Sequence, residues 1–354
     1  MATFINARFL TQPLTGVQRF SLEISKQLIL IRDDLIFLVH CKNEIIDQSL
    51  LNLFNIQEIK GGKGHYWEQV TLPLYLRKNG NPLLLNLSNT APIFYGNKIS
   101  TLHDIIFIKY PQSFSRQFIL FYKLLFPLIL KTSKSIITVS EFSKKDISNF
   151  YKYDSSKVEV IYNATSSFFS KETNANIEKN NNNEYCLAVS SPNYHKNFSA
   201  LIEVYNKIDT NVELKIVGSA SAVFSHMNYK ENNSNIKFLG RASDDELVEL
   251  YRNAKYFIFP SLYEGFGIPP LEAQACGCPV ISSNAASLPE VLNNSAIYFD
   301  PLNPAEMKEV IQSSLDDELL RNELIKRGFS NVKKYSWSFS AKKLNKLLIK
   351  LDKS

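Results

Sequence analysis

The sequence has little of what holds secreted proteins together. Its four cysteines, Cys41, Cys186, Cys276 and Cys278, show no spacing typical of a disulfide framework. Cys276 and Cys278 are too close together for the usual zinc knuckle, and no second pair completes such a site. The N-terminal residues lack the charged lead and apolar core of a signal peptide. We therefore expect a protein of the reducing cytoplasm.

Two short motifs and any long apolar run are also missing. The longest apolar run, Phe118 to Leu130, is interrupted by Lys123 and Pro127 and is too short to span a bilayer. Gly-x-Gly-x-x-Gly does not occur, which weakens a dinucleotide-binding interpretation. Asp-x-Asp does not occur either, so the sequence offers no obvious clamp for a divalent metal, and we expect no metal cofactor.

Charge is distributed unevenly along the chain. The net charge is +6, but residues 1–163 hold 19 basic and 12 acidic side chains, whereas the remaining residues hold 21 and 22. A basic first half suits anionic lipid, nucleic acid or a phosphorylated substrate. A solvated surface without a partner explains the same excess equally well.

Strand and helix patterns alternate on both sides of a polar stretch, which predicts two α/β domains with mostly parallel sheets. A length of 354 residues, about twice that of a usual domain, agrees with this division. We expect domains at 1–163 and 184–335, a linker at 164–183 that is rich in asparagine, serine, lysine and glutamate, and a C-terminal helix at 336–354. The helical pattern of the tail extends over roughly Pro304 to Lys350.

Strands are predicted at Thr3–Asn6, Leu35–Val39, Gln57–Lys60, Leu83–Leu87, Ile99–Leu102, Ile136–Val139, Val158–Ile161, Tyr185–Val189, Glu213–Val217, Ile236–Leu239, Tyr256–Phe259, Val280–Ser282 and Ile297–Phe299. Ser140 is well placed to cap a helix over Glu141 to Phe150.

The most informative stretch follows the strand Tyr256–Phe259. Pro260 and Ser261 end that strand, a glycine-rich turn carries Glu264, and Pro270 predicts the start of a short helix with Glu272 in its first turn. Unpaired N–H groups at the start of a helix, with glycines that allow close approach, suit a phosphate flanked by hydroxyl groups. The alternative is a pair of surface acids on a loop and a helix.

This stretch carries a family resemblance. Glu264 and Glu272, with seven residues between them in Pro-Ser-Leu-Tyr-Glu-Gly-Phe-Gly-Ile-Pro-Pro-Leu-Glu-Ala, resemble the donor-sugar motif of retaining glycosyltransferases of the GT-B fold, family 4. The similarity extends from Ser190–Pro192 to Phe299–Pro301. It implies an α/β fold of two Rossmann-like domains that face each other across a cleft, with the last helix crossing back to the first domain.

The resemblance also implies roles for the residues of the motif. Glu264 would contact the transferred sugar, and Glu272 would bind ribose hydroxyls. The main-chain N–H groups of Gly265, Phe266 and Gly267 would face phosphate or sugar oxygens.

Lys196 follows the first strand of the second half and precedes a helix. A lysine opposite a helix N-terminus is unfavourable unless an anion lies between them. Its turn resembles the family's Arg-Lys-Asn turn, whose lysine contacts the donor diphosphate, but His195 stands where arginine is frequent, and Ser190 where some members carry a second arginine. Arg241 could supply the missing cation or be an ordinary surface arginine.

The first half contributes two further candidates. His103 and Asp104 follow a predicted strand, at the sheet edge where α/β folds bind ligands. In the family, a histidine at this position lies beside the donor sugar; a structural role is the alternative, and Asp104 is expected to cap a helix or orient the loop. Gly16 lies at a strand-to-helix junction and resembles the family's glycine loop over the donor phosphates. Arg19 could reach a substrate or be an exposed helix residue.

Two segments have open interpretations. Trp67, Glu68 and Gln69 could line an acceptor site or belong to an amphipathic core helix. An aromatic and aliphatic set could form a membrane patch beside basic residues, or could be core; it comprises Phe118, Phe121, Tyr122, Leu125 and Phe126, with Arg116, Lys123, Lys131 and Lys134 nearby.

The resemblance implies a retaining, metal-independent transfer of a hexose or deoxyhexose, mannose first, from a nucleotide diphosphate sugar. The acceptor would be a glycan or lipid-linked oligosaccharide of O-antigen or capsule synthesis, met in the cytoplasm or at the inner face of the membrane, with no nucleic-acid partner. In this reading His103, Lys196 and Glu264 act at the reacting centre. The rival hypothesis is a non-catalytic protein of the same fold that binds a nucleotide sugar or a glycan.

Overall fold

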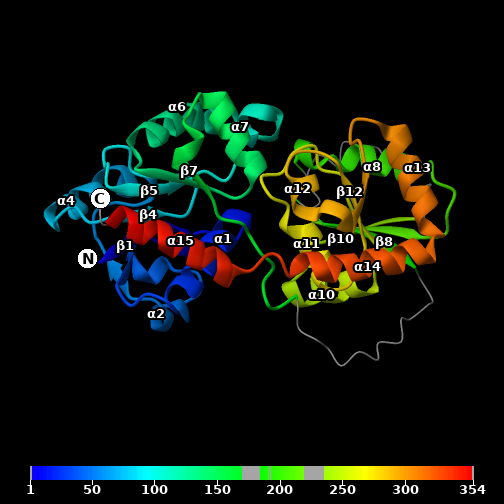
Figure 1. The fold of residues 1–354 in the computed structure, drawn as a ribbon, viewed down its shortest axis with the longest axis horizontal. Helices are drawn as coiled ribbons and strands as arrows, with labels where there is room; N and C mark the ends of the chain where they lie inside the picture. Colours follow the sequence, from blue (N-terminus) through cyan, green and yellow to red (C-terminus); the bar gives the residue numbers. More distant parts are fainter. Residues whose placement is uncertain (1, 170–183, 190, 192, 219–234, 353–354) are drawn as a thin grey trace. The chain divides into compact units, whose positions relative to one another are not determined.

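Two parallel β-sheets organise the chain, one in each of two units (Figure 1). The computed structural model describes residues 2–169, 184–189, 191, 193–218 and 235–352. Unit 1 comprises Met1–Asn163 and Ser336–Ser354, and unit 2 comprises Ala164–Tyr335.

The start of the expected linker belongs to unit 2. Phe169 is buried, its ring contacts that of Tyr251, and its carbonyl oxygen accepts from the Cys276 thiol at 3.6 Å. Residues 164–169 therefore pack into unit 2, and the rest of the expected linker, 170–183, lies outside the described residues.

The sheet of unit 1 has the order β3-β2-β1-β4-β5-β6-β7, with every pair parallel. Its strands are β1 (Thr3–Asn6), β2 (Leu35–Val39), β3 (Ile56–Glu58), β4 (Leu84–Asn86), β5 (Lys98–Thr101), β6 (Ser135–Thr138) and β7 (Val158–Val160). Most of these residues are buried, as expected for parallel strands covered on both faces.

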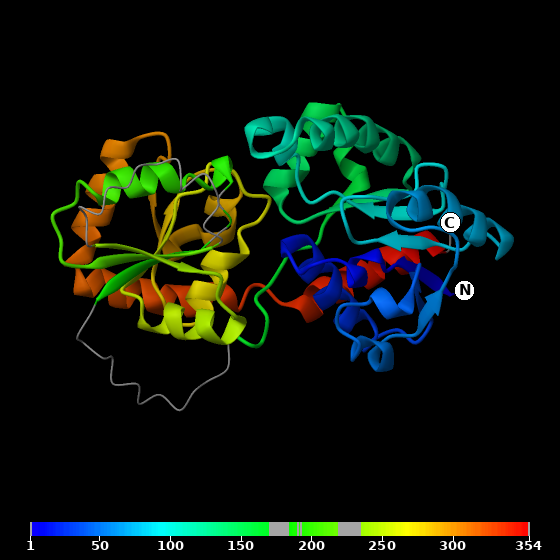
Figure 2. The ribbon, with the colours of Figure 1, turned by 180° about the vertical axis from the view of Figure 1, so that it is seen from behind.

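Helices cover both faces of this sheet (Figure 2). On one face lie α4 (Leu72–Lys78), α6 (Arg116–Thr132) and α7 (Glu141–Tyr151), whose apolar residues pack with Phe4, Leu84 and Ile136. Ser140 caps α7 as predicted, since its hydroxyl accepts from Ser143 N. On the other face lie α1 (Gly16–Leu28) and α15 (Trp337–Asp352), which contact each other.

The C-terminal helix α15 belongs to unit 1 although all of unit 2 lies between it and the rest of unit 1 in the chain. The ring of Trp337 packs against that of Phe20 with centroids 6.0 Å apart. The Ser340 hydroxyl donates to the Tyr162 carbonyl oxygen, and Arg32 donates to the Asn345 side chain at 3.1 Å. The chain thus returns to its first sheet at Ser336.

The sheet of unit 2 has the order β10-β9-β8-β11-β12-β13, also parallel throughout. Its strands are β8 (Tyr185–Val189), β9 (Glu213–Val217), β10 (Ile236–Gly240), β11 (Tyr256–Phe259), β12 (Val280–Ser283) and β13 (Ala296–Phe299). The helices around it are α8 (Phe198–Tyr205), α10 (Asp244–Asn253), α11 (Ile268–Ala275), α12 (Leu288–Leu292), α13 (Pro304–Leu315) and α14 (Glu318–Val332).

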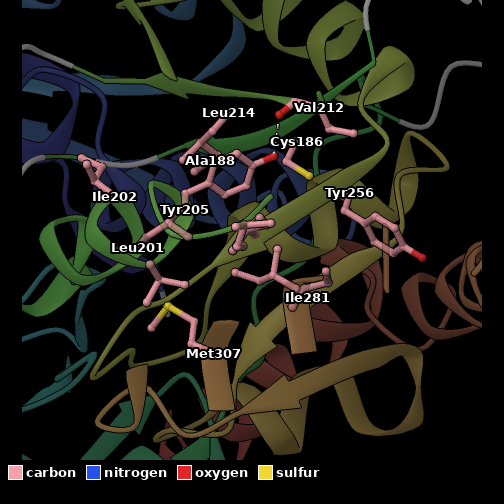
Figure 3. Close-up of a cluster of buried hydrophobic side chains, with 14 of the residues drawn as sticks. Cys186, Ala188, Leu201, Ile202, Tyr205, Val212, Leu214, Tyr256, Ile281 and Met307 are labelled. Carbon is pink, nitrogen blue, oxygen red and sulfur yellow. Dashed lines mark hydrogen bonds between the residues drawn. The ribbon is translucent and has the colours of Figure 1, made fainter. Parts of the chain in front are cut away.

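An apolar core fixes α8 and α13 on one face of this second sheet (Figure 3). Leu201 of α8 and Met307 of α13 are fully buried in it beside Ile281 of β12. The Tyr205 hydroxyl donates to the Val212 carbonyl oxygen at 3.1 Å, so a polar group inside this core is satisfied.

The tail differs from the single helical pattern that the sequence predicts. Three helices, α13, α14 and α15, divide it, with breaks at Asp316–Asp317 and at residues 333–336. Asp317 caps α14 by accepting from Leu320 N at 2.8 Å. A side chain that satisfies the N–H groups of a new helix favours a restart over continuation.

Candidate active site

The two candidate residues of unit 2 come from neighbouring strands. Lys196 ends a 3-10 turn (Tyr194–Lys196) that follows β8, and Glu264 lies in the loop after β11. Because β8 and β11 are paired in parallel, both segments leave the same edge of the sheet. This is the edge at which open α/β sheets bind ligands.

The side chains of Lys196 and Glu264 form an ion pair. The distance from Lys196 Nζ to Glu264 Oε1 is 2.6 Å, and the two side chains are 16% and 12% exposed. The Lys196 ammonium also lies 5.8 Å from the ring centroid of Phe259. The Ser287 hydroxyl donates to the main-chain oxygen of Glu264 at 2.9 Å, which fixes the loop. A cation and an anion are thus held together, both still reachable from solvent.

His195 connects the two segments that carry this ion pair. It is 5% exposed, and its carbonyl oxygen accepts from Leu262 N at 2.7 Å, which joins the Lys196 turn to the Glu264 loop. Burial, together with the positive charge of Lys196, lowers the pKa of His195 to about 4, against an opposing effect of Glu264. His195 is therefore neutral at neutral pH and adds no charge to the site.

The glycine-rich loop is more constrained than the sequence suggests. Gly267 precedes α11 in the left-handed region, with φ of 92°. Gly265, Phe266 and Gly267 are all buried, and the ring of Phe266 packs against that of Tyr335. Close packing around this turn explains why the chain uses glycine at its end.

The N-terminus of α11 offers fewer N–H groups than expected. The helix begins at Ile268, so Pro269 and Pro270, which have no N–H, occupy its first turn. Any anion at this end would be held mainly by the loop and by Lys196, since two of the first four donors of the helix are missing.

Glu272 lies deeper than predicted. Because α11 begins at Ile268, Glu272 falls in the second turn of the helix and not the first, and it is 7% exposed. Burial, together with the Glu272 carboxylate, raises the pKa of Tyr251 well above its ordinary value, which places these two groups close together. Glu272 is a buried acid within unit 2.

Arg241 does not lie beside Lys196 in the sheet. It is exposed and follows β10, which β9 separates from β8. Its position two strands away from the Lys196 turn leaves it at the same sheet edge but on its periphery. Within the described parts of the chain, no group of three His, Cys, Asp or Glu side chains could hold a metal ion.

In unit 1, His103 is a buried neutral histidine. It follows β5 as predicted, and its Nε2 lies 3.1 Å from the Leu87 carbonyl oxygen. Because a carbonyl only accepts, Nε2 carries the proton and Nδ1 is an acceptor. The ring meets that of Phe20 edge to face at 4.9 Å, and burial lowers the pKa of His103 to about 4. Asp104 orients the following loop by accepting from Ile106 N at 3.0 Å, one of the two roles that the sequence suggests, but the N-cap of the next helix is Ile105.

Gly16 is the first residue of α1, after the N-cap Thr15. A Cβ atom built at Gly16 would meet nothing within 4 Å, so open space lies beside this helix terminus. Arg19 lies in the first turn of the same helix, where its main-chain N–H bonds to the Thr15 carbonyl oxygen at 2.8 Å.

Trp67 and Glu68 have different roles in a π-helical stretch, Trp67–Thr71. Trp67 is a core residue, fully buried, with its ring N–H donating to the Ile59 carbonyl oxygen. Glu68 is also buried, yet its carboxylate is surrounded by polar partners: Asn6, Arg8 and Thr90 from distant segments, and His65 from the preceding helical turn. Sequence analysis missed both His65 and Thr90; the helical i, i+3 spacing could have indicated His65, whereas only the tertiary fold brings Thr90 to Glu68.

Of the two interpretations of the aromatic and aliphatic set on α6, core fits most of its members, although Phe118 is 37% exposed. Leu125 and Phe126 are 6% and 1% exposed, and Phe121 and Tyr122 pack against the same core. The exposed face instead carries leucines at every fourth position, Leu120, Leu124 and Leu128, which are 62%, 63% and 42% exposed. In the described chain, no helix is both long and apolar enough to cross a membrane.

Comparison with known proteins decides the family. Residues 169–331 match the family described as "Glycosyl transferases group 1". The chain is 31% identical over 281 residues to the O-antigen chain mannosyltransferase RfbU of Salmonella typhimurium, with 76% of this chain and 75% of that protein aligned. The chain belongs to the group 1 glycosyltransferase family.

Other relatives agree with this assignment. The O-antigen chain mannosyltransferase B of Escherichia coli is 27% identical over 364 residues, covering 92% of this chain and 93% of its own length. Among solved structures, Anabaena Alr3699/HepE in complex with UDP and glucose superposes with a TM-score of 0.76 at 17% identity, over 99% of both chains. The predicted fold class, two Rossmann-like α/β domains of the GT-B type, is confirmed.

Proposed function

We propose that this glycosyltransferase transfers mannose, or another hexose or deoxyhexose, from a nucleotide diphosphate sugar to a glycan or lipid-linked oligosaccharide of a cell-surface polysaccharide. The names of the relatives, O-antigen chain mannosyltransferases, support the sugar and the pathway class. The UDP and glucose of the HepE complex support a nucleotide sugar as donor. GDP-mannose is the first donor to test, with UDP- and dTDP-linked sugars next.

The Lys196–Glu264 pair is the observation that carries the proposal. A departing nucleoside diphosphate accumulates negative charge, which a fixed cation in a partly buried site stabilises. The Lys196 ammonium, 2.6 Å from Glu264 before the donor arrives, would turn to the diphosphate oxygens. Glu264 would then accept from hydroxyls of the transferred sugar. When the ion pair separates, Lys196 would therefore position the diphosphate and Glu264 the sugar, on the two sides of the bond that breaks.

Retention of the anomeric configuration without a double displacement requires the acceptor to attack the sugar C1 from the face that the diphosphate leaves. In this proposal the bond between the sugar C1 and the diphosphate oxygen breaks, and the acceptor oxygen bonds to C1 on the same face. The proton of the acceptor hydroxyl passes to the leaving β-phosphate oxygen. The reaction thus needs no nucleophile from the protein. Lys196, without a metal, would stabilise the negative charge that develops on the leaving diphosphate.

Other residues are assigned to the donor as part of the same proposal. Neutral His103, whose Nε2 is committed to Leu87, would accept from a sugar hydroxyl through Nδ1. Gly16 leaves room at the N-terminus of α1 for the phosphates. The loop Gly265–Gly267 would approach the phosphate and sugar oxygens, Glu272 would bind the ribose, and Arg241 would add positive charge at the periphery.

The test combines binding and turnover. Thermal unfolding is measured with GDP-mannose, UDP-glucose and dTDP-rhamnose, because a donor at about 100 times its Kd adds about 2.7 kcal/mol of stability. The preferred donor is then incubated with and without EDTA, and the product configuration is read by NMR. We expect one preferred donor, turnover that resists EDTA, and a retained anomeric centre.

Variants sharpen this test. Lys196→Ala should lower kcat by about a hundredfold or more, as for other groups that stabilise transition-state charge. Lys207→Ala, which removes an exposed lysine from the same unit, serves as the control and should leave kcat unchanged. Equal turnover by the Lys196→Ala variant and the wild type would contradict the proposal, and donor binding without any turnover would favour the non-catalytic alternative.

We also propose that unit 1 docks on anionic membranes through α6. The exposed leucines of α6, Leu120, Leu124 and Leu128, share this helix with the exposed Lys123 and Lys131, a combination suited to the lipid interface. The exposed Lys145 and Lys152 and the half-buried Lys144 lie on or next to α7, alongside α6 in Figures 1 and 2. Co-sedimentation with phosphatidylglycerol vesicles should fall sharply in Leu120→Ser/Leu124→Ser, whereas phosphatidylcholine vesicles should bind neither protein. Retained binding by this variant would overturn the docking surface.

A further inference from the structure

A polar cluster marks the point where the strand order of unit 1 reverses. From β1 the chain builds β2 and β3 on one side, then returns to place β4 on the other. Asn6 ends β1 and Asn86 ends β4, and Asn6 Nδ2 donates to Asn86 Oδ1 at 3.1 Å. Crevices that bind ligands in open α/β sheets form at such reversals, outside the carboxyl ends of the strands.

A buried carboxylate lies at the centre of this cluster. Glu68 Oε1 accepts from Asn6 and from Thr90, each at 2.8 Å, and Oε2 accepts from Arg8 Nη1 at 3.1 Å. Burial alone would raise the pKa of Glu68, but His65, Arg8 and the hydrogen-bond donors hold it below its ordinary value. Glu68 is therefore a fixed anion whose carboxylate oxygens accept hydrogen bonds from Asn6, Thr90 and Arg8.

Arg8 and His65 extend from this carboxylate toward solvent. The Glu68 side chain is 1% exposed, that of Arg8 13% and that of His65 49%. Arg8 Nη1 also lies 3.2 Å from His65 Nδ1. The same His65 nitrogen lies 3.5 Å from Glu68 Oε2, so it accepts from Arg8 or donates to Glu68 according to the tautomer. The buried acid thus connects to a guanidinium and an imidazole that are progressively more exposed.

An aromatic surface adjoins these donors. The His65 ring lies 4.6 Å from that of Phe121 of α6, and Tyr66, the next residue after His65, is 63% exposed. Planar apolar groups beside fixed donors suit a ligand that has both apolar C–H faces and hydroxyl groups. A saccharide has both.

We propose that Arg8 and His65 bind hydroxyl groups of the acceptor saccharide, and that Glu68 is the positioning residue that holds them. This inference rests on the proposed function, since it assigns the acceptor of that reaction to unit 1. If this network only stabilised the fold, its outermost member, His65, would not need to be half exposed beside the point where the strand order reverses. The saccharide to test is a mannose oligosaccharide, because the proposed reaction adds mannose to a chain of this kind.

The experiment uses the full-length protein with GDP-mannose and mannotriose. In His65→Gln the KM for mannotriose should rise by about tenfold, equivalent to about 1.4 kcal/mol, whereas the KM for GDP-mannose should change by less than about twofold. Arg8→Lys should show the same split, since lysine keeps the charge but loses the planar fork. Lys63→Gln, an exposed change two residues from His65, is the matched control.

A second readout tests Glu68 as a positioning residue. Mannotriose should shift the imidazole NMR signals of His65 in the wild type. In a folded Glu68→Gln variant it should not shift them. Mannotriose that neither reacts nor shifts these signals, or an equal rise of both KM values in His65→Gln, would overturn the subsite. Failure of the wild type to bind or turn over any of the three nucleotide sugars would instead overturn the proposed function, so the two failures are distinguishable.

Discussion

Lys196 and Glu264 share one short contact, 2.6 Å from Nζ to Oε1, with both side chains mostly buried. Each charge compensates the other, so removing one leaves its partner unpaired in a region of low dielectric. Stability and activity at this pair are therefore expected to depend on different properties. Stability requires balanced charge, whereas the proposed chemistry requires the lysine itself.

The first prediction separates these properties. Lys196→Met and Glu264→Gln should each lower the free energy of unfolding by about 2 kcal/mol, less than for a fully buried pair. The double variant should regain most of that loss but stay inactive with the preferred donor. Chemical denaturation and donor turnover measure the two effects. Recovery of turnover in the double variant would show that the ammonium is not needed.

The second prediction compares two glycines of the proposed donor site. Gly267→Ala should destabilise unit 2 by about 1–2 kcal/mol, because alanine is strained at a φ of 92°. Its Cβ would also lie 2.7 Å from a methyl group of Leu288, which can move. Gly16→Ala should leave stability unchanged or higher, since its Cβ meets nothing within 4 Å.

The same pair of variants tests donor approach. If phosphates occupy the space beside Gly16, Gly16→Ala should raise the KM for the donor without a loss of thermal stability. Donor KM and melting temperature, measured together, distinguish a blocked ligand from a damaged fold. A Gly16→Ala enzyme with wild-type donor KM would remove Gly16 from the proposed site.

The third prediction concerns acid. The pKa of His195 is about 4 in the folded protein, below the ordinary value of 6.5, so the unfolded chain binds more protons between these values. Stability is complete above about pH 6.5 and falls as the pH drops toward 4. A difference of about two pKa units corresponds to about 3 kcal/mol. Unfolding of His195→Gln should depend less steeply on pH in this window, and an unchanged slope would assign the acid sensitivity to other groups such as His103.

Much of the fold could be predicted because parallel strands are short, apolar and bounded by polar residues. The predicted bounds of Leu35–Val39 and Glu213–Val217 match β2 and β9. Boundaries set by side-chain caps were harder to predict. The tail read as one helix because its apolar period continues, and only the cap at Asp317 shows where α14 restarts.

The candidate sites show the same limit. Lys196 and Glu264 could each be predicted from the motif around it, and the parallel pairing of β8 and β11 explains why the two are in contact. The face of a helix that is buried depends on its neighbours, so the sequence left the α6 set, including the buried Phe126, open between a membrane patch and core. The cluster around Glu68 depends on contacts across up to 80 residues of sequence, beyond any local pattern.

The fourth prediction concerns a buried base remote from both sites. Lys98 begins β5, is fully buried, and donates to the Tyr95 carbonyl oxygen and the Thr132 hydroxyl, each at 2.6 Å. Burial lowers the pKa of Lys98 from 10.5 to about 7. Between these values the unfolded chain binds the extra proton, so the stability of unit 1 should rise from about pH 7 toward pH 10.

Replacing Lys98 with methionine tests this account. Lys98→Met removes the charge while keeping a similar length, so at pH 6 to 7 it should stabilise unit 1 by about 1–3 kcal/mol, net of two lost hydrogen bonds. It should also flatten the pH dependence above pH 7. Lys134→Met, at an exposed lysine nearby in the chain, should change neither quantity. Because Lys98 lies at the amino end of its strand and the sites lie at the carboxyl ends, turnover of Lys98→Met should equal that of the wild type, and a loss of activity would show that this end of the sheet is coupled to catalysis.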